Sequence, residues 1–244
     1  MDASSGCFVV ATLAIAACAA PPPETPRPAQ APPRVAPASS PPASYPTMAP
    51  VERYREASVE DEVRLARSAA PPSVSDRAGV LVLGEHGYVV ADRGTNGFVC
   101  EVERAWAKDF DDPEFWNPRM RAPNCYNSSG AESVLPAYLE RTEWVLAGVP
   151  VATMIERTKA AVASNRIRPP EPGSMCFMMS RRGWLSDSGG SWHPHLMFFL
   201  PRTKADVWGA NLAGSPLIAI DPALAPVTIF LVPVRKWSDG TADG

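Results

Sequence analysis

The sequence predicts an α+β domain, with one mostly antiparallel sheet and a pair of helices in the middle of the chain. Strand-like patterns occupy two blocks, and helical patterns lie between them at about residues 134–165. Strands and helices that are segregated along a chain, instead of alternating, are typical of α+β folds. The predicted strands cover residues 79–83, 88–91, 98–103, 175–180, 195–200 and 227–232.

Turn residues connect the first three predicted strands. Gly84 and Gly87 bound a hairpin turn, and residues 93–97 form a second turn before the third strand. Successive side chains of a strand point to opposite faces, so the alternation in the third strand predicts its orientation. The residues expected to face the core are Phe98, Cys100 and Val102, and those expected to face solvent are Glu101 and Glu103.

Apolar residues recur twice at helical spacing in the middle of the chain. Gly148 is placed to end the first helix, and the second ends near Asn165, before the Pro169-Pro170 pair. The apolar stripes comprise Val134, Leu135, Tyr138, Leu139, Val145 and Leu146 in the first helix and Val151, Met154, Ile155 and Val162 in the second.

The N-terminal 20 residues are interpreted as an export signal. Residues 8–20 form a thirteen-residue apolar run, which suits the core of a signal peptide and is short for a membrane-spanning helix. Its end, Ile15-Ala16-Ala17-Cys18, resembles the bacterial lipobox, whose cysteine is lipidated and becomes the first residue of the mature protein. The leader before the run contains no Lys or Arg, which departs from the usual basic start. We expect an exported periplasmic or outer-membrane lipoprotein attached through Cys18.

Proline content divides the rest of the chain. Twelve of the 28 prolines lie in residues 21–50, a segment that we interpret as a disordered, extended stalk. Charged, helix-compatible residues follow and predict a peripheral helix over residues 51–71. The α+β domain is then expected to cover residues 72–238, and a short tail residues 239–244.

The charge balance limits the partners. The chain has 23 basic and 26 acidic side chains and a formal net charge of −3, without the basic surface of a nucleic-acid-binding protein. The expected partners are therefore a membrane, through the lipid anchor, and an envelope protein or a small ligand, but no nucleic acid.

Three cysteines follow the signal segment, and two of them should pair in an oxidising compartment. Cys100 points inward from a strand, and Cys125 lies in what we interpret as a proline-rich loop at residues 121–126. We favour a Cys100–Cys125 disulfide with Cys176 as a buried thiol, while the other two pairings stay open.

The segment Trp192-His193-Pro194-His195-Leu196-Met197 contains candidate metal ligands. In an extended strand His193, His195 and Met197 share one face, and imidazole and thioether groups suit copper or zinc. Cys176 adds a soft ligand from another predicted strand. The alternative is that the methionines fill gaps in the core and that a histidine anchors a hydrogen bond. No cofactor is predicted outright, and copper or zinc is the alternative.

Two motifs resemble a group of uncharacterised bacterial exported proteins. They are Gly94-Thr95-Asn96-Gly97-Phe98-Val99-Cys100 with the later Cys125, and Pro194-His195-Leu196-Met197. Members of that group share a GTNGF-x-C turn, a following cysteine and a late P-H-x-M, and the resemblance covers about residues 74–201. It implies the Cys100–Cys125 pairing, favours His195 over His193, and implies no activity.

These observations predict a class of protein without predicting a reaction. We expect an exported, lipid-anchored binding or structural module, with a periplasmic copper- or zinc-binding protein as the alternative and a hydrolase of unfamiliar type as a second. No nucleophile elbow, P-loop, HExxH or Rossmann pattern is present, and no catalytic residue is predicted.

Overall fold

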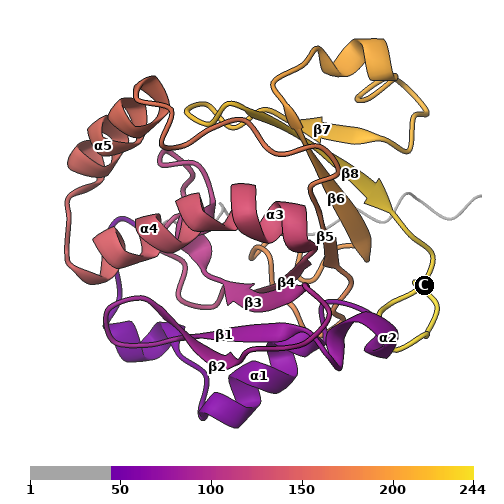
Figure 1. Ribbon diagram of the computed structural model, residues 1–244, viewed down its shortest axis with the longest axis horizontal. Coiled ribbons are helices and arrows are strands. Elements are labelled where there is room, and N and C mark those ends of the chain that lie inside the picture. The colour runs from indigo at the N-terminus through magenta and orange to yellow at the C-terminus, as the bar shows by residue number, and fades with distance from the viewer. Residues whose placement is uncertain (1–44) are drawn as a thin grey trace, which may run out of the picture. The chain divides into compact units, whose positions relative to one another are not determined.

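An eight-stranded sheet in the order β2-β1-β3-β4-β5-β6-β8-β7 organises residues 45–244, which the computed structural model describes. Every neighbouring pair of strands is antiparallel except β1 and β3, so the α+β class with a mostly antiparallel sheet is confirmed (Figure 1). The strands are β1 (Gly79–Leu83), β2 (Tyr88–Asp92), β3 (Val99–Glu103), β4 (Ala122–Tyr126), β5 (Met175–Met178), β6 (His195–Pro201), β7 (Ile218–Ile220) and β8 (Val227–Pro233).

The first three strands are positioned by their turns. β1 and β2 form the expected hairpin, in which the Gly84 amide donates to the Gly87 carbonyl oxygen at 2.8 Å. The chain then returns through Gly94, whose φ is +64°, so that β3 runs parallel to β1. A Cβ at Gly94 would overlap the backbone nitrogen of Gly79, so only glycine fits where the turn passes the start of β1.

Strand β4 lies where a loop was expected. All five of its residues pair with β3, although the second of them is Pro123. β5 pairs with β4 only at Cys125 and Tyr126. At Pro123, therefore, β4 is paired on one side, with β3, and has no strand neighbour on the other within the described residues. Proline is tolerated at such a position because no second ladder requires its missing N–H.

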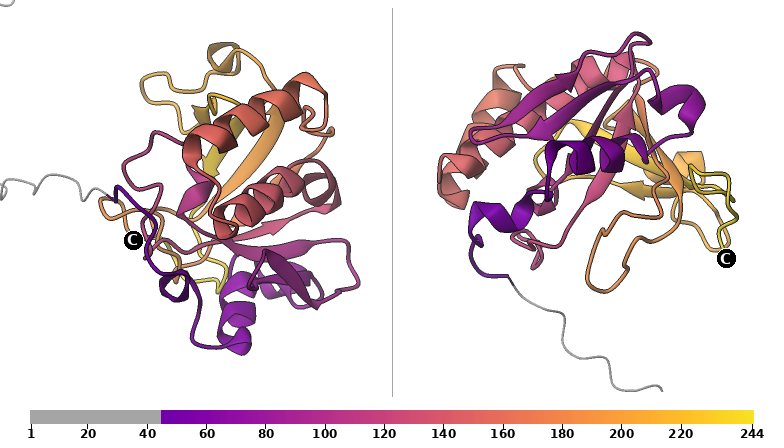
Figure 2. Two further views of the ribbon diagram at one scale, coloured as in Figure 1. Left: turned by 90° about the vertical axis from the view of Figure 1, so that its left-hand side faces the viewer. Right: turned by 90° about the horizontal axis from the view of Figure 1, so that it is seen from below.

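Helices cover both faces of the β1–β3 part of the sheet (Figures 1 and 2). α1 packs on one face, against β1, β3 and β4, while α3 and α4 pack on the other. The expected helical pair is present as α4, which ends before Gly148, and α5, which ends before Asn165. The helices are α1 (Val59–Arg67), α2 (Pro72–Ser75), α3 (Ser128–Ser133), α4 (Leu135–Leu146) and α5 (Val151–Ala163), with short 3-10 helices η1 (Val51–Tyr54), η2 (Ala105–Ala107) and η3 (Ala205–Trp208).

The compact unit begins earlier than residue 72. The helix expected over residues 51–71 is two shorter helices, η1 and α1, and Leu65 and Ala66 of α1 are buried against the sheet. Part of the expected stalk also contacts the domain, because the Tyr45 amide donates to the Pro113 carbonyl oxygen at 3.0 Å. The apolar face of α1 is needed to cover β1 and β3, which explains why it belongs to the core.

The expected tail is also hydrogen-bonded, since the Asp243 amide donates to the Arg235 carbonyl oxygen at 2.9 Å. The signal segment, the lipidated Cys18 and the stalk up to residue 44 lie outside the described residues. Between residues 45 and 244, no helix combines the length and apolar character that crossing a bilayer requires.

Candidate ligand-binding site

The two glutamates of β3 point into the protein, so the expectation that they face solvent was wrong. Cys100 and Val102 pack beneath α1, and Glu101 and Glu103 therefore point to the face that α4 covers. Glu101 is fully buried, and Glu103 is half-buried. Alternation predicts a solvent face only when one side of a sheet is open, and here both sides are covered.

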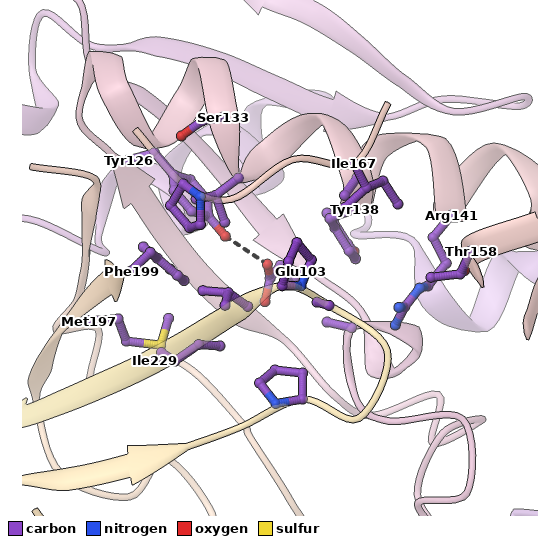
Figure 3. Close-up of a pocket in the computed structure, with 18 of the residues that line it drawn as sticks. Glu103, Tyr126, Ser133, Tyr138, Arg141, Thr158, Ile167, Met197, Phe199 and Ile229 are labelled. Atoms are coloured by element: carbon purple, nitrogen blue, oxygen red, sulfur yellow. Dashed lines mark hydrogen bonds between the residues drawn. The ribbon is translucent and has the colours of Figure 1, made fainter. Parts of the chain in front are cut away.

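Glu103 lines a cavity of about 300 Å³ between the sheet and helices α4 and α5 (Figure 3). Most of its wall is apolar, and the sheet contributes Met178, Met197, Phe199 and Ile229 to it. The polar groups at the cavity are few. They are Glu103, Lys108, Tyr126, Ser133, Tyr138, Arg141, Thr158 and Arg168.

The Glu103 carboxylate accepts a hydrogen bond from the Tyr126 hydroxyl, with 2.9 Å between Tyr126 Oη and Glu103 Oε1 (Figure 3). Burial raises the pKa of Glu103 from 4.5 to about 7, although the hydrogen bond from Tyr126 and the charge of Arg141 act in the opposite direction. Near neutral pH, Glu103 therefore exchanges its proton and can either accept or donate a hydrogen bond.

Glu101 lies next to this group without a visible partner. Neither of its carboxyl oxygens has a hydrogen bond among the described residues, and the side-chain nitrogen of Asn124, directly opposite on β4, has none either. Burial raises the pKa of Glu101 well above 4.5, and the charge of Glu103 adds to the rise. Burial therefore disfavours the charged form of Glu101, since a charged carboxylate without hydrogen-bond partners is costly inside a protein.

Tyrosine hydroxyls fix α4 over this part of the sheet. The Tyr138 hydroxyl accepts a hydrogen bond from the Arg104 amide at 2.7 Å and lies 3.0 Å from the Tyr88 hydroxyl. Tyr88 in turn donates to the Val102 carbonyl oxygen at 2.5 Å. These bonds hold Tyr138 at the cavity wall and place Arg141, one helical turn further on, beside it.

Arg141 is the cation of the cavity that lacks a carboxylate partner. Its Nη1 donates to the carbonyl oxygens of Trp106 and Lys108, at 3.1 Å each, and its guanidinium lies 4.4 Å from the Phe110 ring centre. No salt bridge joins Arg141 to another side chain in residues 45–244, whereas Lys108 pairs with Glu114 at 2.9 Å. Burial lowers the pKa of Arg141, but a guanidinium stays charged at neutral pH.

The Cys100–Cys125 disulfide is confirmed. The two residues lie directly opposite each other in β3 and β4, with an S–S distance of 2.01 Å. Cys176 is a buried free thiol, as expected, and burial raises its pKa well above the ordinary value.

The candidate metal ligands are only partly brought together. Cys176 and Met197 are directly opposite in β5 and β6, and His195 lies two residues from Met197 on the same strand. His195 is buried, and its Nδ1 donates to the carbonyl oxygen of His193 at 2.7 Å, while the His193 ring is 2.6 Å from the Asp243 carboxylate. Within the described part of the chain, no three His, Cys, Asp or Glu side chains are grouped to hold one ion. A copper or zinc site stays a prediction.

Sequence reasoning missed Glu103, Tyr126 and Arg141 as site residues. The signal for the first was present, because two carboxylates two residues apart in an otherwise apolar strand share one face. Nothing local marks the other two, since their role depends on which elements meet at the cavity.

No family model, no curated protein and no solved structure matches this chain. The resemblance to exported proteins through the two motifs thus stays a prediction.

Proposed function

We propose that this domain is the ligand-binding module of an exported, lipid-anchored envelope protein, and that the cavity beside Glu103 holds a small, largely apolar molecule. The cavity carries the proposal. A cavity of about 300 Å³ lies at the lower end of the volumes of small-molecule sites.

The composition of the wall supports binding more than catalysis. Small-molecule sites combine a mostly apolar wall with a few polar groups that orient the ligand, and this cavity has that composition. A hydrolase would need a nucleophile or an activated water beside its acid. The buried thiol of Cys176 is unsuited to that role, because its raised pKa keeps it protonated.

Export and anchoring are supported by the sequence and by the disulfide. The lipobox-like segment at residues 15–18 precedes the proline-rich segment, and a disulfide such as Cys100–Cys125 persists in oxidising compartments. A Cys18→Ser variant should move from the membrane fraction to the aqueous fraction. If it still fractionates with membranes, the lipid anchor is refuted.

Binding is tested by closing the cavity. Ala137 of α4 lines it, so Ala137→Phe should place a ring in the ligand space and weaken binding of an environment-sensitive apolar dye at least tenfold. Ala152→Phe is the matched control, because Ala152 is an exposed residue of α5 outside the lining. Equal dye binding by the two variants and the wild type would contradict the proposal.

A further inference from the structure

We propose that the ligand is an amphipathic carboxylate, whose head group binds Arg141 and whose apolar body lies against the sheet wall of the cavity. This inference rests on the proposed ligand-binding function and specifies the chemical class of ligand. It depends on three features: the free edge of the Arg141 guanidinium, the distribution of charge around the cavity, and the apolar wall opposite.

Arg141 presents an unused pair of donors. Both of its hydrogen bonds within the described residues are made by Nη1, which leaves Nε and Nη2 without a partner there. The bonds to Trp106 and Lys108, together with the stacking on Phe110, fix the plane of the guanidinium. A carboxylate can accept two parallel hydrogen bonds from such a fork, and this geometry is the strongest common form of recognition for that group.

The charges at the cavity favour an anion. Three cations line it, and Lys108 and Arg168 are each paired, with Glu114 at 2.9 Å and with Glu171 at 3.5 Å. Arg141 is the cation without a carboxylate at salt-bridge distance among the described residues, although the charges of Asp109 and Glu103 act on it. Glu103 is the sole carboxylate in the lining, and it already accepts a hydrogen bond from Tyr126.

Glu103 opposes an anionic ligand less than its formal charge suggests. Burial holds its pKa near 7, so a bound carboxylate favours the protonated form, which can donate a hydrogen bond. The titratable and polar groups that surround it are Glu101 on β3, Asn124 and Tyr126 on β4, Cys176 on β5, Tyr138 and Arg141 on α4, and Lys108 after η2.

The apolar wall determines the rest of the ligand. Met178, Met197 and Phe199 lie on neighbouring strands on the sheet side of the cavity, and methionine side chains adapt to flexible apolar chains. At about 30 Å³ for each water-sized group, the volume holds roughly ten such groups. An eight-carbon carboxylate has about that size.

Calorimetry of the full chain with octanoate, octanol and octylamine tests the head group, because the three probes share one apolar chain. We expect octanoate to bind at least tenfold more tightly than the other two. Arg141→Gln should weaken octanoate binding at least tenfold and leave octanol binding within twofold. Arg182→Gln, at an exposed arginine outside the lining, should leave both unchanged.

The outcomes separate this inference from the function on which it rests. If octanol binds as tightly as octanoate, or if octylamine binds most tightly, the inference that the ligand is a carboxylate is overturned. The same result would still support the cavity as a binding site. Binding of none of the three, together with no loss of dye binding in Ala137→Phe, would overturn the proposed function itself. The comparison of head groups uses the wild-type chain, so it stands even if Arg141→Gln does not fold.

Discussion

Two buried acidic side chains show different ways of carrying a carboxyl group inside this protein. Glu62 pairs with Arg104 at 2.8 Å and also accepts the Leu83 amide at 3.1 Å. Glu101 has neither kind of contact among the described residues, and burial raises its pKa well above the ordinary value. The first acid therefore has a counter-charge in the core, whereas burial disfavours the charged form of the second.

Removing one member of the buried pair should destabilise the protein strongly. Glu62→Ala leaves the fully buried Arg104 guanidinium without its counter-charge, so we expect the free energy of unfolding to fall by about 3–5 kcal/mol. Urea denaturation measures this. Glu60→Ala, at an exposed position on the same helix, should change it by less than about 0.5 kcal/mol. Equal effects would show that the pair contributes nothing specific.

Glu103 should make stability fall as pH rises. Its pKa is 4.5 in the unfolded chain and about 7 in the folded protein, so the folded state binds more protons between these values. The contribution of this group to stability is fully present below pH 4.5 and is lost as pH rises through 7. The free energy of unfolding should fall by at most about 3 kcal/mol over this range, because the carboxyl is half-buried. Glu103→Gln should flatten the dependence between pH 5 and 8, measured by urea denaturation.

Glu85→Gln provides the comparison for that experiment, because Glu85 is an exposed residue of the hairpin turn. It should keep the wild-type dependence on pH. A Glu103→Gln variant with the same slope as the wild type would refute the assignment of the raised pKa to Glu103.

At the scale of elements, the turn between β2 and β3 requires glycine at position 94. Gly94→Ala combines a positive φ with an overlap against the backbone of Gly79, and we expect a loss of about 2–3 kcal/mol beyond the strain of the conformation itself. Gly209→Ala isolates that strain, since its φ is +75° and no atom lies within 4 Å of the added Cβ, for a cost of about 1 kcal/mol. Thermal or urea unfolding would measure the loss of stability in both variants. Equal losses would contradict the close approach of Gly94 to Gly79.

The elements with local signals were predictable from the sequence. Gly148 and Asn165 end the two central helices as expected, because both positions adopt the positive φ that terminates a helix. The hairpin around Gly84 and Gly87 was predictable for the same kind of reason. Strand β4 was not predictable, because a proline such as Pro123 indicates a loop in the sequence. Only the structure shows that Pro123 is paired with β3 and has no described strand on its other side.

The candidate site was less predictable than the fold. The inward direction of Glu101 and Glu103 depends on α4 covering a face that the alternation assigns to solvent. Arg141 lies 38 positions beyond Glu103 in the sequence, and only the packing of α4 on the sheet brings both to one cavity. Such distant contacts leave no pattern in a single sequence.

At the scale of the whole molecule, the two faces of the sheet differ in how closely helices cover them. α1 closes one face with small, fully buried residues such as Ala66, and α4 and α5 leave a cavity over the other. A ligand that occupies the cavity binds only the folded state. Octanoate at a hundredfold excess over its Kd should therefore stabilise the protein by about 2.7 kcal/mol, seen as a higher unfolding temperature. Ala137→Phe should abolish the shift, and an equal shift in that variant would place octanoate elsewhere.

The contacts around Tyr54 have a mechanical consequence. Its ring is fully buried beside Trp106, its hydroxyl donates to the Trp116 carbonyl oxygen at 2.8 Å, and its own carbonyl oxygen accepts the Arg104 side chain at 2.6 Å. Tension applied to the chain ahead of Tyr45 meets first the Tyr45–Asp187 contact at 2.5 Å and then this buried ring. A tether on that side would load the centre of the core before any strand at the edge of the sheet, so we expect the domain to resist unfolding under force applied ahead of Tyr45.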